Sequence, residues 1–279
     1  MIIPRIPVGD VIESSIDFLV EHFSFATKAF SAVLETGLDV VESVMKACPP
    51  WAFIIIVGLV TWKLAKSKRT TIFAMAGLLL IWNMGLWNAT ISTIALVIVA
   101  TMLALMIGIP IGILAAMNKH INKVVMPVLD VMQTMPAFVY LIPAIPFFGL
   151  GKVAAIFSTI IFAMPPSIRL TCLGIKQVPE DLVECAEAFG SNRWQRLFKL
   201  ELPIATPTIM AGVNQTVMLA LSMVVIAAMI GAKGLGGEVW KAIQRLQMGK
   251  GFEAGIGIVI VAMIMDQVLQ KMGTGKNSK

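Results

Sequence analysis

The side chains that could perform acid–base chemistry or hold a metal are few and scattered. The two histidines, His22 and His120, have no carboxylate or cysteine neighbours at ligand spacing. The three cysteines, Cys48, Cys172 and Cys185, are an odd number at irregular spacing, which predicts neither a disulfide framework nor a metal site. No G-x-x-x-x-G-K-S/T segment is present, so we expect no catalytic residue, metal or ATP site in this chain.

The remaining candidates for chemistry are polar and aromatic side chains inside long apolar runs, where polar groups are costly and often functional. Aromatic rings can hold a quaternary ammonium group by cation–π attraction. Asp130, Gln133 and Thr134 form a polar strip at the start of one of these runs. We predict a translocation path lined by Gln133, Thr134, Phe138, Tyr140, Asn214 and Gln215. The alternative is that these side chains only pack between helices or bond to neighbouring ones.

Two ionisable residues lie near the ends of apolar runs. Arg169 and Asp266 both fall in the last turns of an expected membrane span. An ion pair between them is one hypothesis. The alternative is that each side chain extends to the membrane interface by itself.

The composition identifies an integral membrane protein. Of the 279 residues, 58% are hydrophobic and only 14% are charged. Soluble globular domains carry about a quarter charged residues. The net charge of +6 is modest, and no basic run is interleaved with aromatic residues, so we expect a lipid bilayer as surroundings and no nucleic acid as a partner.

Hydrophobic runs predict seven membrane-spanning helices. They are expected at about residues 51–64, 71–87, 89–117, 124–151, 153–172, 206–230 and 254–269. Four prolines predict that the fourth span is broken or strongly bent, and Pro165–Pro166 is expected to interrupt the fifth. A turn is expected at Asn88, and a short helix at about 239–246 within a glycine-rich loop.

Residues 1–48 repeat apolar side chains at helical spacing and are rich in acids, which predicts one or two amphipathic helices lying along the membrane. The loops at 63–69 and 118–123 and the tail 271–279 are basic and fall on one side if seven spans are correct. Basic loops are typical of the cytoplasmic side. We therefore expect the N-terminus outside and the C-terminus in the cytoplasm.

Residues 179–203 form a charged stretch between apolar runs. Pro179 can begin a helix, and Gly190 can end it, because glycine tolerates the left-handed conformation. Ser191 is expected to cap a second short helix. This helix–turn–helix cannot lie in lipid, so it lies on the membrane surface or docks onto a partner; an ordinary interfacial helix is the alternative.

The spacing in this stretch resembles the EAA loop of ABC importer permeases, which reads E-A-A, three residues, G, nine residues, I-x-L-P. The matching positions are Glu184, Cys185, Ala186, Gly190, Leu200, Leu202 and Pro203. The sequence differs from the family pattern at Cys185, where alanine is usual, and at Leu200, where isoleucine is usual. The resemblance implies that these residues, within a coupling helix at 179–199, couple the chain to an ATP-binding subunit.

Segments 129–145, 162–179 and 214–239 further resemble the permease subunits of glycine betaine and proline betaine ABC importers. This resemblance implies an all-α integral membrane protein of about seven transmembrane helices with a MetI-like five-helix type I importer core. It implies an amphipathic segment at 1–48, two additional helices at 49–88, a permease core at 89–270 and a cytoplasmic tail at 271–279.

The same resemblance implies that the chain is not an enzyme and works in a bacterial cytoplasmic membrane with several partners. These are a second copy of itself, an ATP-binding subunit that holds ATP and magnesium, and an extracellular substrate-binding protein. The expected solute is glycine betaine or a related quaternary ammonium osmoprotectant. Choline, carnitine or an amino acid remains an alternative solute. A secondary transporter is disfavoured, since we find no inverted repeat and no ion-binding polar pair at the midplane.

Overall fold

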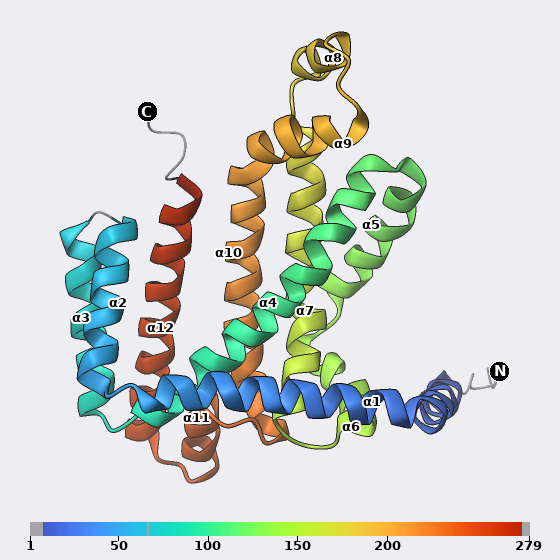
Figure 1. Ribbon diagram of the computed structural model, residues 1–279. Helices are drawn as coiled ribbons and strands as arrows, with labels where there is room; N and C mark the ends of the chain where they lie inside the picture. The colour runs from blue at the N-terminus through green and yellow to red at the C-terminus, as the bar shows by residue number, and fades with distance from the viewer. Residues whose placement is uncertain (1–7, 66, 275–279) are drawn as a thin grey trace, which may run out of the picture.

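The computed structural model describes residues 8–65 and 67–274, which form helices and turns without a strand (Figure 1). The long helices that run roughly side by side are α2 (Pro50–Ala65), α3 (Lys68–Asn83), α4 (Trp87–Met117), α7 (Lys152–Lys176), α10 (Leu202–Ala227) and α12 (Met248–Thr274). The all-α architecture expected from the sequence is confirmed.

The centre of the fold is α7, which packs between α4 and α10. Small residues permit this close packing. A Cβ atom on Gly112 of α4 would lie 2.7 Å from the carbonyl oxygen of Ile168, and one on Gly212 of α10 would lie 3.0 Å from Cβ of Leu170. Glycine at both positions lets backbones approach closely, as is common between helices in membranes.

The fourth expected span is broken, as the prolines predicted. It consists of α5 (Lys119–Thr134), the short 3₁₀ helix η1 (Ala137–Tyr140) and α6 (Leu141–Phe148). The segments 119–134 and 137–148 are bent by 111° relative to each other. The break falls at Met135–Pro136, where Met135 takes an extended conformation, as expected for a residue before proline.

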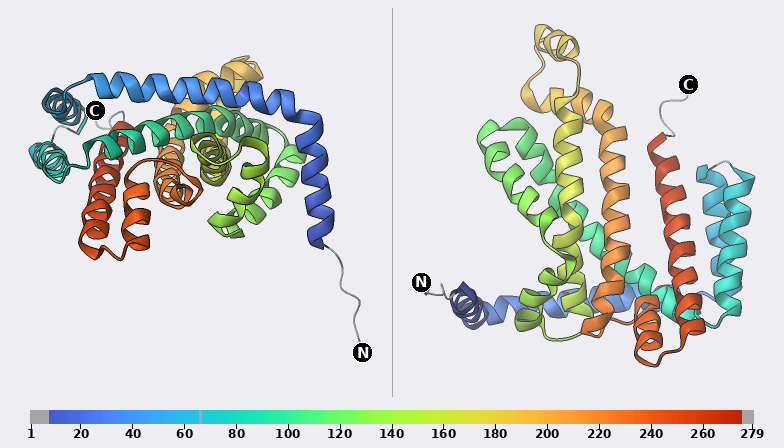
Figure 2. Two further views of the ribbon diagram at one scale, coloured as in Figure 1. Left: turned by 90° about the horizontal axis from the view of Figure 1, so that it is seen from below. Right: turned by 180° about the vertical axis from the view of Figure 1, so that it is seen from behind.

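The N-terminal segment is a single helix, α1 (Val8–Ala47), which lies across one end of the bundle (Figure 1). Past the edge of the bundle this helix bends sharply, as the view from below shows (Figure 2). Leu34 and Leu38 are buried and join the main core. The angle between residues 27–47 and α2 is 100°, so α1 runs across the direction of the spans.

In the part of the chain that the structure describes, the number of helices able to cross a membrane is smaller than the seven spans expected from the sequence. Within the described residues, four helices are long and apolar enough to cross a membrane by themselves, namely α4, residues 193–230, α7 and α12. Counting each bent pair as one span gives up to six. The second expected span, α3, has only 16 residues, so the seventh span rests on a helix that is short for a bilayer.

Two predictions about where helices break were wrong. Pro165 and Pro166 do not interrupt α7, because proline fits helical φ and the helix is held on both sides by neighbours. The turn before α4 falls at Met84–Leu86 rather than Asn88, since Gly85 takes a φ of +72° there.

The short helix in the glycine-rich loop, α11 (Leu235–Gln244), begins four residues earlier than expected. Its first backbone N–H, on Leu235, donates to the hydroxyl of Thr93 on α4 at 2.8 Å. A hydroxyl from a distant helix thus satisfies a donor at the helix N-terminus, which local sequence could not indicate.

The loops expected to be basic lie at one end of the bundle. The α2–α3 connection, the α4–α5 connection, residues 179–203 and the C-terminal end of α12 lie at one end, and α1, α6 and α11 lie at the other (Figure 1). The loops predicted to share one side of the membrane therefore lie at the same end of the molecule. We call these the α8 end and the α1 end.

Candidate functional site

A helical hairpin projects from the α8 end (Figure 1). It consists of α8 (Glu180–Ala188), α9 (Arg193–Arg196) and a π-helical turn, η2 (Leu197–Glu201), which continues into α10. Gly190 ends α8 with a φ of +76°. The N–H groups of Gly190 and Ser191 donate to the carbonyls of Glu187 and Ala186 at 2.8 and 3.0 Å, which forms a Schellman motif.

The second helix of the hairpin is capped by Asn192, not by Ser191 as the sequence suggested. The Asn192 side chain accepts from the backbone N–H of Gln195 at 2.8 Å, and the Gln195 side chain accepts from the Asn192 N–H at 2.9 Å. This reciprocal pair is a capping box with asparagine and glutamine. Ser191 occupies the position after the left-handed glycine instead.

The hairpin presents large apolar side chains to its surroundings. Phe189 is 86% exposed, and Trp194 and Phe198 are each 61% exposed. The rings of Trp194 and Phe198 stack with centroids 6.0 Å apart. Side chains of this size gain free energy when they are covered, so this surface is suited to a protein partner.

Arg196 holds the two halves of the hairpin together. Its guanidinium pairs with the carboxylate of Glu187 on α8 and, at 2.7 Å, with that of Glu201 in η2. Glu201 is 8% exposed and needs this partner, because a buried carboxylate without a counter-charge is costly. The sequence analysis did not assign Arg196 a role; the signal in the sequence was a run of basic residues, Arg193, Arg196 and Lys199, followed by Glu201.

The base of the hairpin is packed into the bundle. Leu197 is 1% exposed and forms a small core with Ile175 of α7 and Ala205 of α10. Arg193 donates to the backbone carbonyl of Met117, the last residue of α4, at 3.1 Å. The base of the hairpin therefore contacts three long helices directly.

The residues of the EAA resemblance divide between these two parts. Glu184, Cys185 and Gly190 are exposed on α8 and its turn, and Ala186 is half-buried. Leu200 and Leu202 are half-buried at the base, where Leu202 packs against the small core, and Pro203 begins α10. The first group is available to a partner, while the second joins the hairpin to the bundle.

The six residues predicted to line a path are not all equally accessible. Gln133, Thr134, Phe138 and Gln215 are exposed in the single chain. Tyr140 is 6% exposed; its hydroxyl donates to the backbone carbonyl of Met132, and its ring packs edge-on against Phe162. Asn214 is half-buried and donates to Asp266 of α12 at 2.8 Å. Their role in a path stays a prediction.

The hypothesised ion pair between Arg169 and Asp266 is wrong. Arg169 pairs with Asp130 of α5 at 2.5 Å, whereas Asp266 accepts from Asn214 and Gln270. The reason is geometric: Arg169 lies on the side of α7 that meets α5, and α12 packs on α10 instead. Among the described residues, no three His, Cys, Asp or Glu side chains are arranged to hold a metal.

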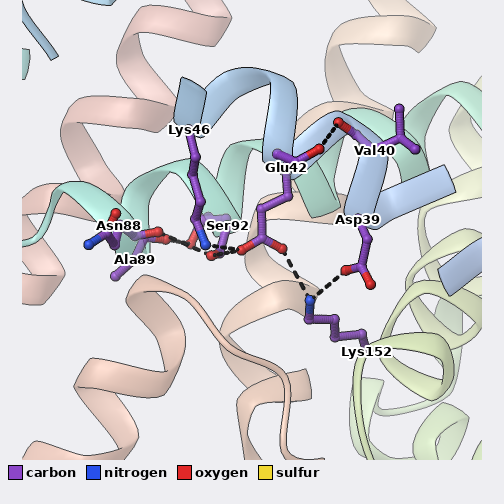
Figure 3. A network of polar contacts seen from close by, with 10 residues as sticks. Asp39, Val40, Glu42, Lys46, Asn88, Ala89, Ser92 and Lys152 are labelled. Atoms are coloured by element: carbon purple, nitrogen blue, oxygen red, sulfur yellow. Dashed lines mark hydrogen bonds and ion pairs between the residues drawn. The ribbon is translucent and has the colours of Figure 1, made fainter. Parts of the chain in front are cut away.

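A second polar cluster fastens α1 to the bundle at the opposite end (Figure 3). Glu42 accepts from Ser92 of α4 at 2.6 Å and from Lys46, and Lys152 at the start of α7 pairs with Glu42 and Asp39. Burial alone would raise the pKa of Glu42, but the hydrogen bonds from Lys46, Ser92 and Lys152 lower it to about 2. Sequence reasoning missed this cluster because its members lie far apart in the chain.

Comparison with known families gives one family match. The family model described as "Binding-protein-dependent transport system inner membrane component" matches residues 108–270. The match covers the part of the chain from the middle of α4 to α12, including the hairpin.

Several characterised proteins are similar over nearly the whole chain. The glycine betaine transport system permease protein OpuAB of Bacillus subtilis is 46% identical, covering 99% of this chain and 98% of the relative. The glycine betaine/carnitine transport permease protein GbuB of Listeria monocytogenes is 48% identical, covering 96% of each. The glycine betaine/proline betaine permease protein ProW of Escherichia coli is 43% identical over 98% of this chain and 77% of its own length.

Among solved structures, an inward-facing conformation of the MetNI methionine ABC transporter is similar in fold. One of its chains aligns with a TM-score of 0.60 and 20% identity, covering 75% of this chain and 98% of that chain. At this identity the likeness concerns the fold alone, and it agrees with the MetI-like core expected from the sequence.

Proposed function

The chain belongs to the family of binding-protein-dependent transport system inner membrane components, and we propose that it is the permease subunit of an ATP-driven importer for glycine betaine or a related quaternary ammonium solute. The relatives that match nearly the full length are permeases for glycine betaine, and one of them is also named for carnitine. In this function the chain forms the path, and ATP hydrolysis takes place on another subunit, which binds ATP and magnesium.

The observation that carries the proposal is the projecting hairpin. It presents Glu184, Phe189 and Gly190 on α8 and its turn, and its base contacts α4, α7 and α10. An ATP-binding subunit seated on α8 would move these three helices as rigid rods when it changes shape. This arrangement supports the coupling role that the EAA resemblance implies.

Two further partners complete the proposed assembly. A second copy of the chain would form the path together with the first, because the polar residues Gln133, Thr134 and Gln215 are exposed in a single copy. A separate substrate-binding protein would deliver the solute to the α1 end. The α8 end then faces the cytoplasm, in keeping with the basic loops at that end.

Uptake of labelled glycine betaine tests the function. The chain is produced together with its ATP-binding and substrate-binding partners in bacteria that lack their own osmolyte importers. We expect uptake that is abolished when Glu184 and Gly190 are both replaced, at unchanged abundance of the chain. Unlabelled carnitine, choline and amino acids serve as competitors. Uptake of an amino acid but not of betaine would overturn the solute and leave the permease role intact.

A further inference from the structure

Helix α5 exposes two different faces along its length. One face carries the polar side chains Lys123, Asp130 and Thr134, spaced seven and four residues apart, and Gln133 lies beside them. The other face carries apolar side chains, which are Val124 at 67%, Val128 at 52% and Val131 at 60% exposed. At 100° per residue, the two sets point in clearly different directions.

The two faces cannot have the same surroundings in a membrane. Asp130 lies eleven residues after Lys119, which corresponds to about 16 Å along the helix. Its side chain is 64% exposed, and that of its partner Arg169 is 39% exposed. Charged groups at such a depth do not face lipid; they face water or other polar groups. The valine face suits lipid, and the polar face needs an aqueous space.

Arg169 is only partly satisfied by the contacts within the chain. Its Nη2 atom donates to Oδ1 of Asp130 at 2.5 Å, whereas its buried Nε atom has no hydrogen-bond partner among the described residues. Most of the Asp130 side chain is exposed. Because the side chains of Arg169 and Asp130 are 39% and 64% exposed, part of each charged group is accessible to a third molecule that carries both charges.

We propose that the polar face of α5 lines an aqueous passage in the half of the membrane next to the α8 end, and that Asp130 and Arg169 are the charged groups that meet the transported solute there. The solute class is a zwitterion: its carboxylate would replace Asp130 beside Arg169, and its quaternary ammonium group would face Asp130. Each charge of the solute is then balanced while it is out of bulk water.

This inference rests on the proposed import of a zwitterionic solute, but it adds two residues and assigns them a role. The competing explanation is that the ion pair only fastens α5 to α7. The two explanations differ in two respects: whether water reaches the polar face, and whether the solute changes that access.

Cysteine labelling tests the aqueous face. Gln133→Cys and Val131→Cys are each made in a Cys185→Ala parent, which removes the exposed native thiol, and the assembled transporter is placed in membrane vesicles with the α8 end outward. A membrane-impermeant maleimide reacts with thiolates, which form only in water. We expect the Gln133→Cys variant to react at least about tenfold faster than the Val131→Cys variant, which serves as the lipid-facing control. Equal, slow reaction at both positions would overturn the aqueous face.

Solute protection tests the charged pair. Excess glycine betaine is expected to slow the labelling of Gln133→Cys, and this protection should vanish when Asp130→Asn and Arg169→Gln are added together. The double change leaves no unpaired charge, so a purely structural pair predicts unchanged protection and near-normal uptake. We expect instead that uptake falls by about tenfold or more at normal abundance.

The outcomes separate this inference from the proposed function. If the unmodified chain imports glycine betaine but the double variant transports and is protected like its parent, the role of the charged pair is wrong and the proposed function stands. If the unmodified transporter imports no zwitterion at all, the proposed function fails, and with it the role of Asp130 and Arg169, whatever the labelling at position 133 shows.

Discussion

Replacing Gly190 by valine should weaken the connection between ATP hydrolysis and transport. Gly190 has a φ of +76°, and no atom lies within 4 Å of the position that a Cβ would occupy. The cost of a side chain there is therefore conformational and does not arise from a clash. For residues other than glycine the left-handed region costs about 1–2 kcal/mol, and a β-branched residue falls at the upper end.

That cost acts on the turn that sets the angle between α8 and the base of the hairpin. A penalty of about 1–2 kcal/mol changes the population of the intact turn roughly 5–30-fold. The hydrogen bonds at 2.8 and 3.0 Å from Gly190 and Ser191 would be lost in the altered turns. We expect Gly190→Val to lower uptake about tenfold, with the chain still present in the membrane and its spans folded.

The assay is uptake and ATP hydrolysis measured on the same proteoliposomes, which gives the number of solute molecules imported per ATP. Gly85→Val is a matched control, because Gly85 has a φ of +72° and equally free space, but lies in the α3–α4 turn at the opposite end. The reasoning is refuted if Gly190→Val imports as many molecules per ATP as the unmodified chain, or if Gly85→Val loses as much.

Three further predictions concern single side chains. Arg196→Ala should destabilise the base of the hairpin by about 3–5 kcal/mol because it leaves Glu201 buried without a counter-charge, and Arg196→Ala/Glu201→Leu should recover most of the loss in thermal unfolding. Gly112→Ala should cost about 1–3 kcal/mol in the same measurement, since its Cβ would meet the Ile168 carbonyl at 2.7 Å; an unchanged Tm would contradict this packing. The pKa of the Glu42 carboxyl is lowered to about 2. Its ionised form therefore stabilises the docking of α1 at pH values above the unfolded pKa of about 4.3, and this stabilisation is lost as the pH falls toward 2. Hydrogen exchange in α1 should become faster over this pH range, and Glu42→Gln should remove this pH dependence.

Much of this fold could be predicted from the sequence because membrane helices are encoded locally. Apolar runs, proline breaks and basic loops follow from the chemistry of a bilayer, so the bend after Thr134 and the shared end of the basic loops were expected. The left-handed conformation of Gly190 was also expected, since a glycine after an amphipathic run commonly ends a helix.

What the sequence did not reveal depends on contacts between distant segments. The partner of Arg169 could not be chosen from spacing, because Asp130 and Asp266 are both expected near the same depth in the membrane as Arg169. Only the packing of α5 on α7 decides between them. The cluster around Glu42 and Lys152 joins residues about a hundred positions apart and leaves no local pattern. Pro165 suggested a break because local rules omit the neighbouring helices that stabilise α7.

The most direct test of coupling through α8 uses its own exposed thiol, Cys185. A photoreactive group attached there in the assembled transporter should cross-link mainly to the ATP-binding subunit, as judged by the mass of the adduct. The control is Arg245→Cys in a Cys185→Ala background, which carries the same group on the exposed α11–α12 turn at the opposite end. The account predicts an ATPase adduct from position 185 and none from position 245. Adducts from position 185 that contain lipid or the substrate-binding protein, and no ATPase, would contradict it.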